Sequence, residues 1–269
     1  MGQDQAATGA GAMKRAPTLA LAALCLAGAA LTAAPARAAG AGGAELDAVH
    51  IDLGDRAALQ RGAKLFINYC LSCHSASYMR YNRLGRDLGI SDELIKKNLL
   101  FAGSQVGDLM VTTMPAEDSQ KWFGVAPPDL SLTGRARGAE WLYTYMRSFY
   151  IDHSAPSGWN NKLFENVAMP HVLYELQGVQ RPVIAAEEEV MEGRLVTVEK
   201  IQRFELVRPG KLTPAEYDQA VSDLTHYMVY MAEPAQLQRY TVGFWVVVFL
   251  LLLLVPAWLL KKEYWKDVP

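Results

Sequence analysis

The chain has 269 residues, which is enough for one domain with a sizeable core or for two domains. Its formal net charge at pH 7 is −2, whereas nucleic-acid-binding proteins carry a clear basic excess, so we expect no nucleic-acid partner. Acidic residues outnumber basic residues further once both chain ends are left out, which favours attraction of a basic partner.

The N-terminal region has the three parts of a secretory signal. Met13 and two basic residues precede an apolar run at 16–31, and residues 36–38 (Ala-Arg-Ala) place small side chains at a cleavage-like site. We therefore expect residues 1–38 to be a signal peptide, with Met13 as an alternative start. The competing interpretation, a first transmembrane helix, is disfavoured because the run is short and rich in alanine.

The C-terminal region contains a run that is long and apolar enough to cross a membrane. Residues 240–260 include no charged side chain, and at a rise of about 1.5 Å per residue such a run reaches about 30 Å. It is apolar on every face, which disfavours a helix of a soluble core. Three lysines lie in residues 261–269, which predicts a cytoplasmic tail. Residues 39–239 would then be the periplasmic domain of a single-pass protein of the bacterial inner membrane.

One short motif predicts the chemistry. Cys70 and Cys73 are the two cysteines outside the expected signal, and His74 follows directly, which is the attachment pattern of a c-type haem. In that pattern each thiol adds to a haem vinyl group, and the histidine is the proximal ligand of the iron. A zinc site would need a second cysteine pair, and a thioredoxin-like redox pair would need a βαβ context. A disulfide between residues three apart would close too small a loop to stabilise the fold. We therefore expect one covalently bound haem c.

The sixth position on the iron has two leading candidates. Met114 and Met169 each precede a proline, which favours an extended loop that aims the sulfur inward. Most other methionines fall in apolar helical patterns and are expected to fill the core. A histidine ligand would give the iron a lower reduction potential than a methionine ligand. The histidines that could serve are His50, His153, His171 and His226. The residues alone leave the choice between Met114 and Met169 open.

Taken together, the motifs resemble the cytochrome c1 family, the haem-bearing subunit of the cytochrome bc1 complex. The resemblance covers nearly all of the chain after residue 38. It rests on residues 70–74 (Cys-Leu-Ser-Cys-His), 80–81 (Arg-Tyr), 126–131 (Ala-Pro-Pro-Asp-Leu-Ser), 135–137 (Arg-Ala-Arg), 169–173 (Met-Pro-His-Val-Leu) and 232–234 (Ala-Glu-Pro). Many cytochromes share the haem motif, whereas the combination with the other segments and a C-terminal anchor is more specific.

The resemblance implies roles for individual residues. By position, the cofactor-binding residues would be Cys70, Cys73, His74, Met169, Arg137, Pro127 and Pro128. Met169 would be the distal iron ligand opposite His74, which decides against Met114. Arg137 would pair with a haem propionate, because a planar guanidinium binds a carboxylate in a bidentate way, although a solvated surface charge is the simpler alternative. The two prolines would line the haem pocket without adding an N–H group that needs a partner.

The resemblance also implies a function. It is one-electron transfer in the cytochrome bc1 complex, from a Rieske iron–sulfur protein to a soluble or membrane-tethered cytochrome c, with cytochrome b and membrane lipid as neighbours in a dimeric assembly. The chain would be catalytic only as part of that quinol:cytochrome c oxidoreductase. Two alternatives stay open: a tethered monohaem subunit of a terminal oxidase or nitrite reductase, and a haem peroxidase or gas sensor with an open sixth site.

The expected fold is mainly α: a cytochrome c-like haem domain with insertions, followed by one C-terminal transmembrane helix. A helix is expected at 55–69, where Gly62 allows another helix to approach closely. A second helix should begin at Thr213, with Glu216 completing a capping box, and a break at Pro234 should separate it from the anchor.

One insertion departs from this helical pattern. Within residues 177–210, the stretch 194–208 alternates imperfectly between apolar and polar residues, which predicts that it holds both strands of a small β-hairpin.

Overall fold

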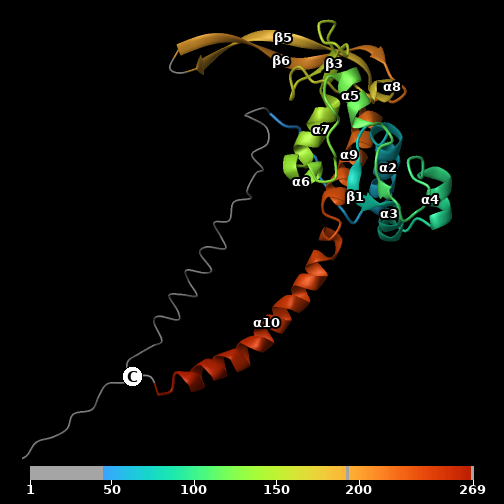
Figure 1. The fold of residues 1–269 in the computed structure, drawn as a ribbon. Helices are drawn as coiled ribbons and strands as arrows, with labels where there is room; N and C mark the ends of the chain where they lie inside the picture. Colours follow the sequence, from blue (N-terminus) through green and yellow to red (C-terminus); the bar gives the residue numbers. More distant parts are fainter. Residues whose placement is uncertain (1–44, 192–193, 268–269) are drawn as a thin grey trace, which may run out of the picture. The chain divides into compact units, whose positions relative to one another are not determined.

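Helices account for most of the regular structure of the protein, a computed structural model that describes residues 45–191 and 194–267 (Figure 1). The helical segments are α2 (Arg56–Leu65), η1 (Phe66–Cys70), α3 (Tyr81–Leu88), α4 (Asp92–Asn98), α5 (Ala116–Phe123), α6 (Thr133–Arg137), α7 (Ala139–Arg147), α8 (Tyr174–Gln177), α9 (Pro214–Ala232) and α10 (Gln236–Tyr264). The strands are β1 (Ala76–Arg80), β2 (Leu109–Met110), β3 (Phe149–Ile151), β4 (Trp159–Asn161), β5 (Gly178–Met191) and β6 (Arg194–Pro209). They form three antiparallel pairs, β1–β2, β3–β4 and β5–β6. The mainly α fold expected from the sequence is confirmed.

The core forms around α9, which packs against α2, α6 and α7 (Figure 1). The capping box predicted at its start is present: Thr213 accepts from the backbone of Glu216, and the Glu216 carboxylate accepts from the backbone of Thr213. The helix expected at 55–69 is also present, as α2 followed by the single π-helical turn η1. The Asp55 carboxylate caps α2 by accepting from the Ala58 amide at 3.0 Å.

Two glycines let neighbouring helices approach the backbone of α9. A Cβ atom added at Gly62 on α2 would lie 2.0 Å from the carbonyl oxygen of Asp223, and one added at Gly134 on α6 would lie 2.5 Å from that of Met228. The close approach predicted at Gly62 is therefore confirmed. Arg61, next to this contact, donates two hydrogen bonds to the buried Asp223 carboxylate, at 2.6 and 2.8 Å. This bidentate pair fixes the register of α2 on α9.

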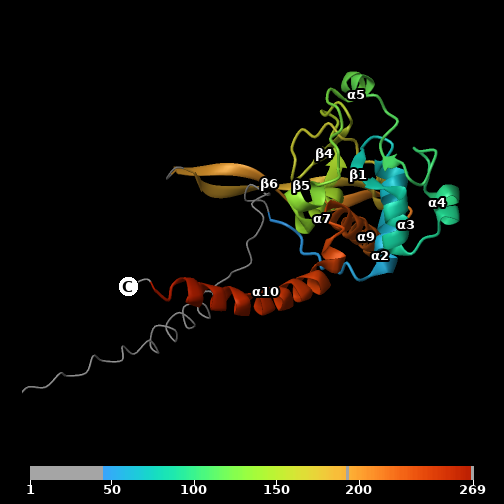
Figure 2. The same ribbon diagram turned by 60° about the horizontal axis from the view of Figure 1, so that its bottom comes forward.

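The β5–β6 ribbon corrects one sequence-based prediction (Figure 2). Residues 194–208 do not hold both strands of a hairpin, because they lie within the single strand β6. The partner strand is β5, with Gly178 opposite Pro209 and Met191 opposite Arg194. The run of glutamates and Pro182 in β5 hides its strand character in the sequence, and pairing with β6 overrides that weak local preference.

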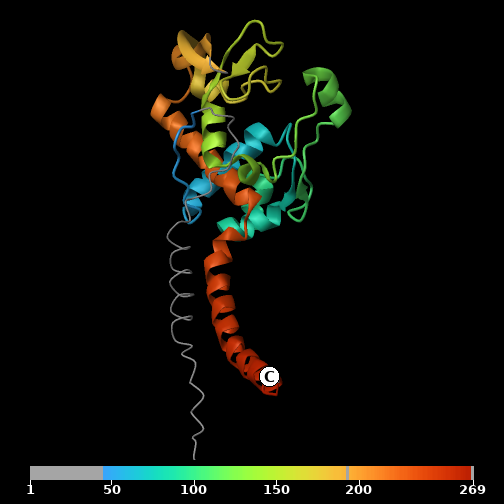
Figure 3. The same cartoon turned by 90° about the vertical axis from the view of Figure 1, so that its left-hand side faces the viewer.

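The C-terminal helix α10 has the length and composition of a membrane span (Figure 3). Its mean hydropathy reaches 2.6 over the most apolar window, and none of its side chains is buried within the protein. It extends past the predicted run 240–260 at both ends. As predicted, the chain breaks at Pro234, between the end of α9 and the start of α10. The expected signal peptide, residues 1–38, lies outside the described residues.

The first prediction concerns the α2–α9 contact. Gly62→Ala should lower the free energy of unfolding by about 1–3 kcal/mol, because the added methyl group overlaps the backbone of α9. Alanine normally stabilises a helix interior relative to glycine, so the sign of the change is diagnostic. Chemical denaturation followed by circular dichroism measures it, with Gly107→Ala as control, because a Cβ at Gly107 meets nothing within 4 Å. A Gly62→Ala protein as stable as the unmodified chain would contradict the close approach.

Candidate haem-binding site

The Cys-x-x-Cys-His segment forms a tight turn at the end of η1. The amides of Cys73 and His74 both donate to the carbonyl oxygen of Cys70, at 3.1 and 2.8 Å. Cys70 is buried, and this burial, with a smaller effect of Cys73, raises the pKa of the Cys70 thiol to about 12. Such a thiol is neutral at physiological pH and is a poor nucleophile.

The His74 ring is oriented by a backbone carbonyl. Its Nδ1 lies 2.8 Å from the carbonyl oxygen of Pro128, which accepts a hydrogen bond and so places the ring proton on Nδ1. Burial lowers the pKa of His74 below its usual value, against the opposing effects of the Pro128 carbonyl and the Asp129 carboxylate. The lowered pKa favours the neutral ring, and Nε2 has no hydrogen-bond partner among the described residues. A metal-ligating imidazole needs this arrangement.

Segments distant in sequence meet at this turn. The amide of Leu130 donates to the carbonyl oxygen of Ser75 at 2.8 Å, and the Thr112 hydroxyl donates to that of Ser72 at 2.7 Å. The joined segments carry large apolar side chains that are exposed, namely Tyr78, Leu109, Val111 and Leu132. Covering exposed apolar side chains of this kind with a flat apolar macrocycle is favourable, because it removes them from water. The residues around Cys70 and His74 therefore fit a haem.

The methionines divide as the sequence predicts. The core contains Met79, Met110, Met146, Met228 and Met231, so these side chains fill space as expected. Met114 and Met169 are only half-buried. The amide of Met114 donates to the hydroxyl of Thr112, the residue that is tied to Ser72. Both candidates stay available as sulfur ligands.

The histidines on offer as ligands have different environments. His50 and His153 are exposed. Both nitrogens of His226 are occupied, because Nδ1 lies 2.7 Å from the carbonyl oxygen of Ser222 and Nε2 accepts from the amide of Asp52. His171 is 1% exposed, and neither of its ring nitrogens has a hydrogen-bond partner among the described residues. Burial lowers its pKa to about 4, so this ring is neutral.

A row of contacts joins Arg137 to Met169. The guanidinium of Arg137 lies over the Trp141 ring at 5.0 Å, and that ring stacks on Tyr145 with centroids 4.8 Å apart. The Tyr145 hydroxyl in turn donates to the sulfur of Met169, at 3.5 Å. Arg137 is exposed and has no carboxylate partner within the described part of the chain. The fold thus connects two predicted site residues, Arg137 and Met169. Trp141 and Tyr145, which the sequence did not single out, lie between them.

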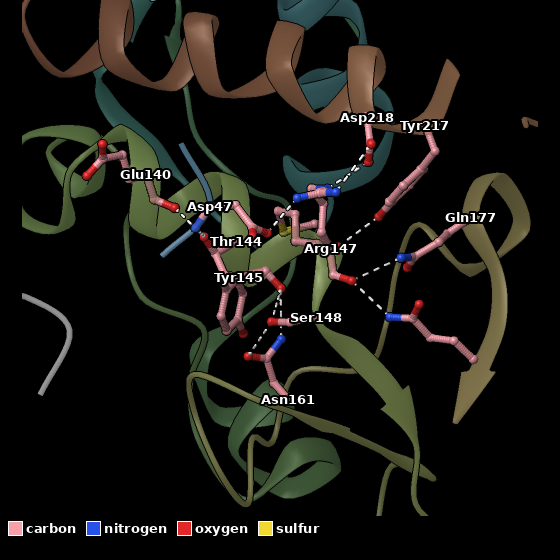
Figure 4. A network of polar contacts seen from close by, with 12 residues as sticks. Asp47, Glu140, Thr144, Tyr145, Arg147, Ser148, Asn161, Gln177, Tyr217 and Asp218 are labelled. Atoms are coloured by element: carbon pink, nitrogen blue, oxygen red, sulfur yellow. Dashed lines mark hydrogen bonds and ion pairs between the residues drawn. The ribbon is translucent and has the colours of Figure 1, made fainter. Parts of the chain in front are cut away.

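Two asparagines of β4 hold the loop that carries Met169. Asn160 accepts from the amide of Asn166 at 2.9 Å, and Asn166 has a positive φ of 58°, a conformation that asparagine tolerates. Asn161 accepts from the amide of Leu163 and donates to the backbone carbonyl of Tyr145 at 2.8 Å (Figure 4). The loop is therefore fixed to the same residue whose hydroxyl contacts the sulfur.

One sequence signal for the missed residues exists. Trp141, Tyr145 and Phe149 recur every fourth residue, which predicts one aromatic face, and they precede the β3–β4 pair and the loop with Met169. Phe149 also stacks on His171, with ring centroids 5.0 Å apart. The pattern indicates an aromatic face but not its partner, because the partner belongs to a later loop.

A cavity of about 320 Å³ lies away from the Cys-x-x-Cys-His turn. Its lining is mainly polar and includes Arg147, Gln180 and Arg203, and none of the predicted site residues contributes to it. Among the described residues, no group of three or more His, Cys, Asp or Glu side chains is arranged to hold a metal ion.

Comparisons with known proteins agree with the haem hypothesis. The model of the Cytochrome C1 family matches residues 50–109 and 99–268. Cytochrome c1 of Allochromatium vinosum is 50% identical over 88% of this chain and 96% of the relative. The ammonia monooxygenase gamma subunit of Nitrosomonas europaea is 48% identical over 83% of this chain and 89% of the relative. Cytochrome c1 of Rhodospirillum rubrum is 26% identical over 80% of this chain and 83% of the relative. The chain belongs to the cytochrome c1 family, the membrane-anchored, haem c-based electron carriers of the cytochrome bc1 complex.

Proposed function

We propose that the chain binds one haem c covalently through Cys70 and Cys73 and carries single electrons from a Rieske iron–sulfur protein to a cytochrome c. The observation that carries this proposal is the His74 ring, whose Nδ1–H is held by the Pro128 carbonyl while Nε2 has no hydrogen-bond partner among the described residues. When bound, the haem supplies a one-electron iron couple. The chain contributes the binding, the orientation and the electrostatic surroundings of that couple, beside cytochrome b in a dimeric complex.

The two prolines have separate tasks in this proposal. Pro128 orients His74 through its carbonyl oxygen, and Pro127 supplies a wall residue without an N–H group. The exposed Arg137 guanidinium has no carboxylate partner among the described residues, so it is free to pair with a haem propionate. Trp141 supports this guanidinium from one face.

Met169 would hold the iron together with His74. Its sulfur is positioned by Tyr145, in a loop that is separate from the Cys-x-x-Cys-His turn. Met114, in contrast, is tied to the Cys-x-x-Cys-His turn. Its amide donates to the Thr112 hydroxyl, which in turn donates to the carbonyl oxygen of Ser72, so Met114 lies close to the segment that supplies His74. Histidine–methionine ligation in an apolar pocket gives a high reduction potential.

The proposal includes a membrane arrangement. Residues 1–38 are a signal peptide, residues 39–239 form the periplasmic haem domain, residues 240–260 cross the inner membrane within α10, and residues 261–269 are cytoplasmic. The lysines in the last turn of α10 favour this orientation.

Co-purification from detergent-solubilised membranes tests the function as a whole. The chain should elute with a multi-span b-type cytochrome, and added quinol should reduce its haem within that assembly. Elution with the subunits of a terminal oxidase or nitrite reductase would contradict the proposal. Elution with an assembly that oxidises ammonia would instead assign the chain the role named for its Nitrosomonas europaea relative.

Covalent attachment has its own prediction. The haem should stay on the denatured chain through acid-acetone extraction, and it should move to the acetone phase when Cys70→Ala and Cys73→Ala are combined, because both proposed thioether bonds are then absent. Absorbance of the two phases measures this. Cys25→Ala is the matched control and should retain the haem, because Cys25 lies in the proposed signal peptide. Extraction of the haem from the unmodified chain would contradict the c-type assignment.

A further prediction separates the two methionines. Met169→Leu should abolish the weak near-infrared sulfur-to-iron absorption band, lower the reduction potential and let carbon monoxide bind the reduced iron, because the sulfur ligand is lost. Met114→Leu is the matched control and should change none of the three. The opposite pattern would make Met114 the ligand. Carbon monoxide binding to the unmodified protein would favour the peroxidase or gas-sensor class instead.

A further inference from the structure

The Tyr145 side chain makes an unusual polar contact. Its hydroxyl donates to the Met169 sulfur at an O–S distance of 3.5 Å, and this sulfur is its only hydrogen-bond partner among the described residues. A thioether sulfur is a weak acceptor, so a phenol directed at it needs support from its surroundings.

Two ring contacts and one hydrogen bond to its backbone hold Tyr145 in place. Trp141 stacks on one face, with centroids 4.8 Å apart and an interplanar angle of 12°. Phe149 meets the ring edge-on at 5.0 Å and 73°. Asn161 accepts from the amide of Leu163 in the loop of Met169 and donates to the carbonyl oxygen of Tyr145, so the loop and the phenol are held in one frame (Figure 4). The hydroxyl therefore has little freedom to turn away from the sulfur.

We propose that Tyr145 is a positioning residue that raises the reduction potential of the haem iron through its hydrogen bond to the Met169 sulfur. This inference rests on the proposed function, in which Met169 is the iron ligand. A thioether sulfur has two lone pairs, so one is left for the phenol when the other is on the iron. The hydrogen bond draws electron density from the sulfur and so weakens its donation to the iron. The oxidised iron has the higher charge and loses more stabilisation from this than the reduced iron, so the reduction potential rises.

Tyr145→Phe in the haem-loaded full-length chain tests the proposal, because it removes the hydroxyl and keeps the ring. At a fixed electrode potential the ratio of reduced to oxidised haem should fall by up to about tenfold, which is about 59 mV for a one-electron couple. The near-infrared sulfur-to-iron band should remain, and carbon monoxide should stay excluded. Tyr143→Phe makes the same chemical change on the same helix, at a residue that contacts Arg147 rather than Met169, and should leave the potential unchanged.

The outcomes separate an electronic role from a structural one. Loss of the near-infrared band or binding of carbon monoxide in Tyr145→Phe would show that the phenol only holds the loop, and this would overturn the inference. An unchanged or raised potential would also overturn it. In a Met169→Leu background, Tyr145→Phe should have no further effect on the potential, because the sulfur that transmits the effect is gone. An equal shift in both backgrounds would contradict transmission through the sulfur.

Failure of this inference is distinguishable from failure of the proposed function. If Met169→Leu opens the iron to carbon monoxide while Tyr145→Phe leaves the potential unchanged, Met169 remains the ligand and only the inference falls. If Met169→Leu leaves both the band and the carbon monoxide response unchanged, the ligand assignment falls, and the role of Tyr145 falls with it.

Discussion

The arrangement of the candidate site depends on how the last turn of α7 is held. The final carbonyl groups of a helix have no partner within the helix, and leaving them unpaired in the interior is costly. Here side chains from other elements donate to them: Asn161 of β4 to Tyr145, Tyr217 of α9 to Met146, and Gln180 of β5 to Arg147, at 2.8 Å each (Figure 4). Gln177 of α8 adds a fourth donor at 3.1 Å. Four elements thus converge on one helix end.

This convergence places the residues proposed to face the haem. The Arg147 side chain forms ion pairs with Asp47 and with Asp218 of α9, so both its backbone and its guanidinium anchor α7. With α7 fixed, Trp141 and Tyr145 extend toward Arg137 on one side and the loop of Met169 on the other. The proposed distal ligand is therefore positioned by helix-end hydrogen bonds.

Helix α9 connects the two halves of the candidate site. On one side it receives α2 through the close contact at Gly62, and α2 leads through η1 into Cys70 and His74. On the other side its Tyr217 hydroxyl holds α7, which carries Tyr145. His74 follows α2 and η1, and the loop of Met169 is held on α7, so both proposed iron ligands are connected to helices that pack on α9. The bidentate pair of Arg61 with Asp223 stabilises this shared support.

Patterns confined to a few neighbouring residues were readable from the sequence: the Cys-x-x-Cys-His motif, the capping box at Thr213, the apolar run of α10 and the segments that carry the family resemblance. Such patterns are encoded locally by spacing and residue type, so one chain is enough to find them. The partner of β6, the Tyr145 hydrogen bond to Met169 and the burial of His171 were decided only by tertiary structure. Each joins residues from different elements, and no local periodicity records which element will pack against which. The aromatic face of α7 was visible as a spacing of four, but its partner loop was not, because the spacing of residues within one helix does not record which distant segment packs against it.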